Sequence, residues 1–152
     1  MLTLKAQGVL VEGSLEELRE ELYLTRRATQ YIIDALWELD KLLSINQLHQ
    51  MFYKMLREQG FRAHQAKQIY KCALSVVKSA RKSNGNKLVL KKLSTRLDKY
   101  DTKIDLKNQL VIVKLRNKLF KIKLLHSKED IRKFVGRKWY EVIISIDRQR
   151  RL

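Results

Sequence analysis

The sequence predicts an α+β fold, in which a small antiparallel β-barrel or sheet carries a three- to four-helix bundle inserted after its first strand. Two observations predict it. The spacing of apolar residues falls from about 3.6 to about 2 after Gly85, and one short strand pattern precedes all the helical ones. Because strands are expected on both sides of the helices, the first strand should return to the sheet from far away in sequence. We therefore expect residues 1–12 and 86–152 to form a β domain and residues 13–85 an inserted helical lobe.

The first strand and the first helix are predicted at the start of the chain. Residues 2–11 have a strand pattern that ends at Gly13. Ser14 and Glu17 then have the spacing of a capping box, in which each side chain accepts from the backbone N–H of the other residue. Apolar residues recur three, four or seven positions apart from there to about Leu43. One long helix, or two in series, should cover this stretch.

Two further helices are predicted before the β domain. Ser44 and Gln47 repeat the cap spacing and predict a second helix, which should stop at Gly60. The apolar spacing predicts a third helix from about Arg62 to Lys82.

The remaining chain alternates apolar and polar residues, as strands do. The most regular stretch, residues 111–124, predicts a hairpin whose two-residue turn is Asn117 and Lys118. In that register Lys114 lies directly opposite Lys121, and like charges in opposed positions destabilise a ladder. No carboxylate is expected among the cations of that face. The strand patterns cover residues 87–93, 103–108, 109–115, 118–125, 131–136 and 138–146.

Charge separates the two halves of the chain. Lys and Arg number 33 against 16 Asp and Glu, which gives a net charge of +17. Residues 1–80 have a net charge of +2 and residues 81–152 a net charge of +15. Such an excess favours polyanionic partners, and its position predicts that the β half binds them.

The sequence offers no motif for catalysis or metal binding. Its one cysteine, Cys72, cannot form an internal disulfide or build a zinc site alone, and His49, His64 and His126 have no second ligand at metal spacing. No nucleotide-binding or hydrolase motif is present. No apolar run is long enough for a membrane span, and the start lacks a signal-peptide pattern. We expect a cytoplasmic, non-enzymatic protein without cofactor, metal, membrane or small-molecule partner.

The order of these features also resembles a known family. A short basic strand and a helical insert lead to "FRAHQAKQIYKCALSVVKSARK" at 61–82, to a basic segment at 88–115 and to "GRKWYEVII" at 136–144. This order is similar to the N-terminal part of the TnpB (OrfB) proteins of insertion sequences, RNA-guided DNA nucleases related to type V CRISPR effectors. The resemblance implies a wedge-like β-barrel with an inserted recognition lobe, in which Trp139 and Tyr140 would open the last barrel strand.

The chain departs from that family at its end. TnpB proteins continue into a RuvC-like nuclease with clustered acidic residues, whereas here Asp147 is followed by Arg148 and the sequence ends at Leu152. The resemblance therefore implies that the nuclease is missing from this chain. A separate RuvC nuclease segment would then be a partner.

A first set of candidate binding residues lies on or beside the strands. Such a cationic surface can follow a phosphate backbone while an aromatic ring stacks on an unpaired base. A solvated face is the alternative for any single lysine, but a bound polyanion would offset the mutual repulsion of the whole set. These residues are Lys91, Lys92, Arg96, Lys99, Tyr100, Lys103, Lys114, Arg116, Lys118, Lys121 and Lys123.

A second set lies on the third helix. His64, Gln65 and Gln68 near its start could reach base edges. By the resemblance, this start and the loop at Tyr100 to Thr102 would lie where the family reads the duplex motif that flanks its target. An amphipathic helix with a solvated basic side is the alternative. The cations of the helix are Arg62, Lys67, Lys71, Lys78, Arg81 and Lys82.

These observations lead to one functional hypothesis and two alternatives. The hypothesis is a nucleic-acid-binding module of a TnpB-like, transposon-associated protein, which binds structured RNA and target-flanking DNA duplex without nuclease activity of its own. One alternative is a stand-alone, non-enzymatic DNA-binding regulator from a mobile element or virus. The other is a protein-interaction domain that uses the nearly neutral helical bundle.

Overall fold

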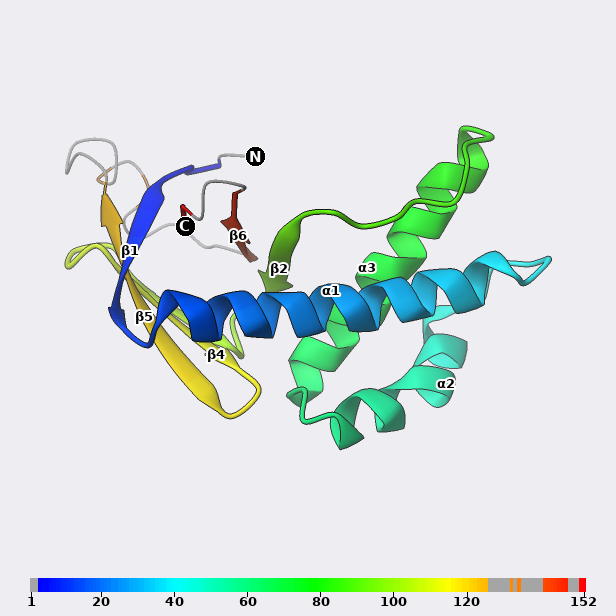
Figure 1. The fold of residues 1–152 in the computed structure, drawn as a ribbon, viewed down its shortest axis with the longest axis horizontal. Coiled ribbons are helices and arrows are strands. Elements are labelled where there is room, and N and C mark those ends of the chain that lie inside the picture. Colours follow the sequence, from blue (N-terminus) through cyan, green and yellow to red (C-terminus); the bar gives the residue numbers. More distant parts are fainter. Residues whose placement is uncertain (1–2, 126–131, 133, 135–140, 148–150) are drawn as a thin grey trace.

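The chain folds into three helices, a four-stranded antiparallel sheet and a two-stranded sheet (Figure 1). The structure is a computed structural model that describes residues 3–125, 132, 134, 141–147 and 151–152. The α+β class is as predicted, and the described strands form open sheets rather than a closed barrel. Three residues named above lie outside the described residues: His126, Trp139 and Tyr140. The predicted strand at 131–136 also lies outside them, except for residues 132 and 134.

The elements follow one another in the predicted order, with one strand before all the helices. In the part of the chain that is described, no helix is long and apolar enough to cross a membrane. The elements are β1 (Gln7–Glu12), α1 (Leu15–Trp37), α2 (Ile45–Glu58), α3 (Ala63–Lys82), β2 (Leu93–Leu97), β3 (Thr102–Asp105), β4 (Leu110–Leu115), β5 (Lys118–Leu125) and β6 (Val142–Ile146).

Both predicted serines cap their helices, but of the two predicted capping boxes only the one at Ser44 and Gln47 has both bonds. The backbone N–H of Glu17 donates to Ser14 Oγ over 3.1 Å at the start of α1. At the start of α2 the bonds are reciprocal: Gln47 N–H donates to Ser44 Oγ at 3.3 Å, and Ser44 N–H donates to Gln47 Oε1 at 2.8 Å. These side chains satisfy amide groups that have no partner within the helix.

Helix α1 ends at Trp37, earlier than the predicted end near Leu43. Arg81 of α3 holds this end of the helix, since its guanidinium donates to the last two helical carbonyls, of Leu36 and Trp37, and to the oxygen of Leu39 just beyond them. A cation at a helix C-terminus is also favoured by the helix dipole. Arg81, predicted to contact nucleic acid, is therefore a cap of α1 instead.

The first strand does return to the sheet from far away in sequence. The strand order is β1-β5-β4-β3, with Gly8 opposite Leu124, and β2 pairs with β6 in the second sheet. The predicted strand at 87–93 is wrong, because β2 begins only at Leu93. The amide of Gln30 on α1 holds the preceding segment, since its Nε2 donates to Leu88 O at 3.1 Å and its Oε1 accepts from Leu90 N at 2.8 Å.

The β4–β5 hairpin has the predicted faces but a different register. Its turn is at Arg116 and Asn117, one residue earlier than predicted, and every cross-strand partner is therefore shifted by two residues. Lys114 lies opposite Leu119, and Lys121 lies opposite Ile112. A shift of two keeps every side chain on its face. Arg116 adopts a left-handed φ of 55°. Contacts from the turn to the helices, which the strand pattern cannot reveal, fix this position.

Two hydrophobic cores are joined by α1. One core lies within the helical bundle and includes Ile32, Phe52 and Tyr70. The other lies against the two sheets and includes Phe120 together with Leu18 and Leu22 from the first turns of α1. Figure 1 shows α1 running along the molecule from the sheets to the bundle. The start of the predicted helical lobe is thus part of the β core.

Candidate nucleic-acid interface

One face of the four-stranded sheet carries a group of lysines. Val111, Val113 and Phe120 point into the core, so alternation places Lys103, Lys114, Lys121 and Lys123 on the opposite face. We call these four residues the lysine face. No described element covers it, since Lys103, Lys114 and Lys123 are exposed and Lys121 is partly exposed.

The strand register gives the spacing of the lysine face. Lys103 and Lys121 both lie opposite Ile112, one on each side, so their Cα atoms are about 10 Å apart. Lys121 and Lys123 follow each other on one strand at about 7 Å. Lys114 and Lys121, predicted to be directly opposed, are diagonal neighbours instead.

Carboxylates are present near this face, contrary to the prediction. Lys121 Nζ lies 3.6 Å from the Glu12 carboxylate on the neighbouring strand. Asp105 lies near Lys103, but Asn108 donates to its carboxylate at 2.7 Å, and these hydrogen bonds are the main cause of its lowered pKa. Lys103, Lys114 and Lys123 form no ion pair with the described residues, so they are available to a phosphate.

Arg116 and Lys118 contact the helices rather than the lysine face. Arg116 Nη1 lies 3.4 Å and Lys118 Nζ 3.9 Å from Oε2 of Glu21, which is 1% exposed on α1. Burial raises the pKa of Glu21, although both cations oppose that rise. These contacts anchor the hairpin to α1, and because both side chains stay partly exposed, their predicted role in nucleic-acid binding stays a prediction.

Gln65 has the same structural role. It is 1% exposed, and its Oε1 accepts from the backbone N–H groups of Arg62 at 3.2 Å and Arg116 at 3.1 Å. The side chain thus joins the start of α3 to the hairpin turn. It does not reach solvent, so the prediction that it reads base edges is corrected.

The start of α3 and the loop after β2 lie together. The His64 ring stacks on Tyr100 with centroids 3.9 Å apart and planes 17° apart. Asp98 holds both residues, since its Oδ2 lies 2.9 Å from His64 Nδ1 and its Oδ1 accepts from the Tyr100 N–H at 2.9 Å. Lys99 Nζ lies 5.5 Å from the Tyr100 ring centroid. We call His64, Asp98, Lys99 and Tyr100 the His64 corner.

The residues beside the His64 corner are mainly structural. Arg62 Nε donates to the buried Asp101 carboxylate at 2.6 Å. Thr102 is buried, and its hydroxyl has no partner among the described residues. Thr102 faces the core because it lies opposite Val113, so its predicted contact with nucleic acid is corrected.

The other predicted residues are spread over the surface. Gln68 on α3 is half-buried, and Arg96 Nε lies 3.5 Å from the Glu141 carboxylate. Lys67 is partly exposed, and the exposed residues in this group are Lys71, Lys78, Lys82, Lys91, Lys92 and Arg96.

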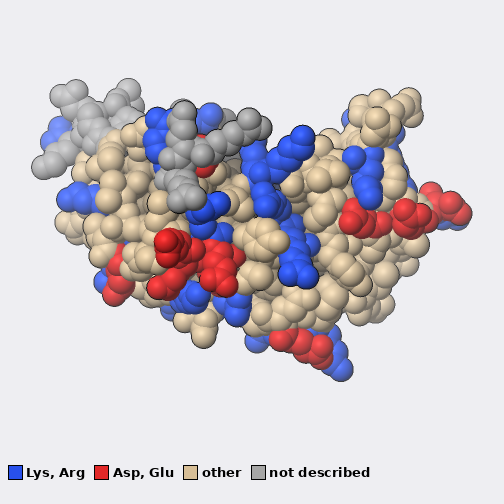
Figure 2. All heavy atoms as spheres, in the orientation of Figure 1, with Lys and Arg blue, Asp and Glu red and all other residues tan. Residues whose placement is uncertain are grey.

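Sequence reasoning missed an exposed row on α1. Tyr23, Arg26, Arg27 and Tyr31 lie on the side of the helix away from its core residues, and Figure 2 shows a band of basic side chains over the middle of this face. The signal was in the sequence, because aromatic and basic residues follow each other there at helical spacing, outside the apolar stripe.

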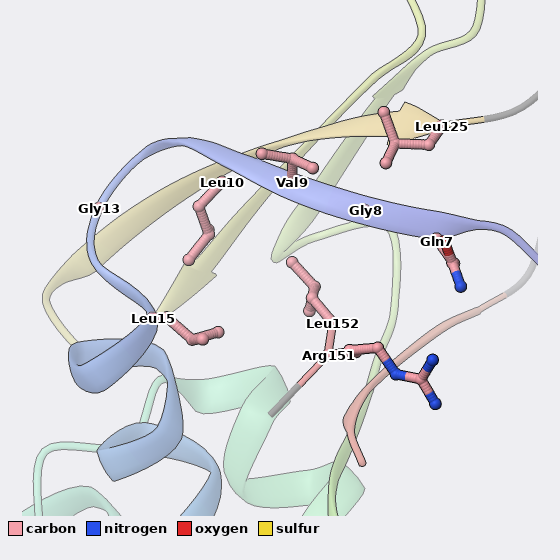
Figure 3. Close-up of a pocket in the computed structure, with 9 residues that line it drawn as sticks. All are labelled: Gln7, Gly8, Val9, Leu10, Gly13, Leu15, Leu125, Arg151 and Leu152. Carbon is pink, nitrogen blue, oxygen red and sulfur yellow. The ribbon is translucent and has the colours of Figure 1, made fainter. Parts of the chain in front are cut away.

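The described surface has one hollow beside β1 and another along α1, and the described residues contain no group of three or more His, Cys, Asp or Glu that could hold a metal ion. One hollow, of about 500 Å³, lies between β1 and the last residues of the chain (Figure 3). Leucine side chains from four positions line it, and the guanidinium of Arg151 pairs with Asp147 at 2.9 Å. This hollow therefore offers a ligand mainly apolar contacts. The other hollow lies along α1 and is considered below.

Comparison of the chain with protein-family models, with curated proteins and with solved structures found no match.

Proposed function

We propose that this chain is a nucleic-acid-binding module, with structured RNA as its main ligand and duplex DNA as its second, and without nuclease activity of its own. The observation that carries the proposal is the lysine face. Three of its four lysines form no ion pair with the described residues, and the face is open to a ligand.

The electrostatics of such a surface favour a polyanion over a solvated state. Lys114 and Lys121 are diagonal neighbours, and Lys121 and Lys123 share one strand face. The repulsion among these lysines destabilises the free protein. Phosphates bound between them would replace that repulsion by attraction between opposite charges. Release of counterions from the nucleic acid adds to the gain.

The family part of the proposal has a separate basis. It rests on the order of features along the sequence and on the contact between the start of α3 and the loop at Tyr100. We propose that the chain corresponds to the barrel and recognition lobe of a TnpB-like protein, with the His64 corner directed at duplex DNA.

The salt dependence of binding tests the role of the lysine face. We expect the triple variant Lys103→Gln, Lys114→Gln, Lys123→Gln to weaken binding to an RNA hairpin and to a DNA duplex. The slope of log K against log salt should flatten by about 0.7 to 0.9 for each lysine that contacts a phosphate. Fluorescence anisotropy at several salt concentrations would measure both quantities.

A control variant with the same change of charge separates a specific surface from net charge. Lys41 and Lys54 are exposed on or beside the helices and belong to neither candidate set, so they are compared with the double variant Lys114→Gln, Lys123→Gln. Replacement of Lys41 and Lys54 by Gln should change affinity much less. Equal losses in the two variants would contradict the proposal. A clear preference for duplex DNA over the RNA hairpin at equal salt would favour the DNA-binding regulator.

A further inference from the structure

The exposed row on α1 has the chemistry of a stacking surface. Tyr23 and Tyr31 are 47% and 59% exposed, and their positions differ by about 12 Å along the helix axis. Arg26 and Arg27 lie between them. The Arg26 guanidinium lies 5.4 Å from the Tyr23 ring centroid, and Arg27 forms no ion pair with the described residues. We call these four residues the α1 row.

The α1 row forms one wall of a groove of about 650 Å³. The segment Val89 to Lys91, which precedes β2, forms the other wall. Arg26 Nη1 donates to Lys91 O at 2.9 Å, and Gln30 bonds the backbone on both sides of Val89. Because these bonds hold the two walls together in the free protein, a ligand would find the groove already formed.

The charge of the groove favours an anionic occupant. Arg27 and Lys91 are exposed along it, and its one carboxylate, Asp34, lies 3.2 Å from Lys87 Nζ and accepts from Gln30. Figure 2 shows the basic band over this part of α1 and acidic side chains beside it, towards the start of the helix, where Glu16 and Glu17 lie in the first turn. These acidic residues would repel a phosphate backbone and so bound the site on one side.

We propose that this groove binds single-stranded nucleic acid, with bases stacked on Tyr23 and Tyr31 and phosphates held by Arg27 and Lys91. Exposed aromatic rings interleaved with cations are what sequence-tolerant single-strand binding requires. An acidic peptide would use the cations but would leave the two rings without a comparable partner. This inference rests on the proposed function and adds a second surface, on the helices, to the lysine face.

Binding of labelled single strands to the full chain tests the groove. The probes are a 12-nucleotide oligouridine and a 12-nucleotide oligothymidine, measured by fluorescence anisotropy. Replacing Tyr23 and Tyr31 by Ala should raise Kd by about 5- to 140-fold for each ring that stacks. Replacing both by Phe keeps the rings and should leave Kd within about twofold of the parent protein. Arg27→Gln, at an exposed position, should flatten the salt slope by about 0.7.

The outcomes separate this inference from the proposed function. If the variant with Ala at Tyr23 and Tyr31 binds single strands as tightly as the parent protein, the inference about the groove is wrong. The lysine-face variants would still test the proposed function. An equal loss for inorganic polyphosphate, which has no bases, would overturn the stacking role. Binding of a poly-glutamate peptide as tightly as the oligonucleotides would assign the groove to an acidic peptide. If the unaltered chain binds none of the nucleic acids, both proposals fail.

Discussion

The carboxylate of Glu21 lies between the helices and the β4–β5 hairpin with two cations beside it. Burial destabilises the ionised form of Glu21 more than the two cations stabilise it, and the pKa of Glu21 is therefore raised above its ordinary value of 4.5. The folded protein therefore keeps a proton on Glu21 at pH values where the unfolded chain has released it. The free energy of unfolding should fall as pH rises from about 4.5 through the folded pKa.

The variant Glu21→Gln tests whether the charge on Glu21 lowers the free energy of unfolding. The neutral amide removes the penalty of a buried charge, and the partly exposed Arg116 and Lys118 can be hydrated once the carboxylate is gone. We expect an unchanged or higher melting temperature at pH 7 and a flatter dependence of stability on pH above 4.5. Glu20→Gln removes the same charge from an exposed position on α1 and should not flatten it. A large loss of stability at pH 7 would show that the ion pair outweighs the burial cost.

Gln65 tests whether a side chain predicted to bind a ligand instead holds the fold. Gln65→Leu leaves the part-buried N–H groups of Arg62 and Arg116 without their acceptor, so the free energy of unfolding should fall by about 1 to 3 kcal/mol. Gln68→Leu, half-buried on the same helix, should change it by less than about 0.5 kcal/mol. Urea unfolding of both variants measures the difference. Equal stabilities would contradict the bridging role.

The case of Gln65 shows where residue-level prediction stops. Its sequence position near the start of α3 is compatible with an exposed side chain that reads bases and with a buried one that caps the helix. The deciding contact comes from Arg116, far away in the chain. A polar residue becomes a bridge only when the fold brings an unpaired donor to it, and local spacing carries no information about that.

At the scale of elements, alternation predicts which face a side chain occupies better than it predicts pairing. Val113 and Phe120 face the core as expected, although the turn consists of Arg116 and Asn117 rather than the predicted Asn117 and Lys118. The apolar pattern rules out shifts by one residue, which would bury the lysines, but it permits shifts by two. The bonds of Arg116 to Gln65 and Glu21 choose between the registers that remain.

The docking of β1 against β5 depends on a close approach at Gly8. A Cβ atom there would lie 2.5 Å from Cγ2 of Ile122, and the Gly8 N–H donates to Leu152 O at 3.3 Å. Gly8→Ala should therefore lower the free energy of unfolding by about 1 to 3 kcal/mol, as overpacking does. Val9→Ala, at the exposed neighbouring position, should cost less than about 0.5 kcal/mol. A Gly8→Ala variant as stable as the parent in urea would mean that β1 can shift away from β5 without loss.

At the scale of the whole molecule, the sequence predicted an inserted bundle because the strand pattern is interrupted by helical spacing and resumes afterwards. It could not predict that α1 would belong to both cores. Leu18 and Leu22 follow the same apolar stripe as Ile32, and only the position of the sheets separates them into different clusters. The same helix also carries Glu21 and the α1 row, so α1 connects the candidate binding surfaces to both cores.

Removal of residues 1–12 tests this architecture as a whole. The deletion takes away β1, which forms the edge of the four-stranded sheet, and so exposes the edge of β5 and removes the packing of Leu10 from the second core. An exposed strand edge is a template for pairing with another chain. We expect aggregation or loss of the sheet transition, while helical circular dichroism persists because the bundle core contains no residue of β1.

A shorter deletion provides the control for that experiment. Removal of residues 1–6 leaves β1 intact and should preserve both the melting temperature and the oligomeric state of the parent protein, measured by circular dichroism and light scattering. The contrast between the two deletions assigns any loss to the strand itself rather than to a shortened terminus. A 13–152 chain with the parent's oligomeric state and an unchanged melting temperature would mean that the sheet is complete without β1. The distant return of the first strand would then contribute nothing to the stability of the fold.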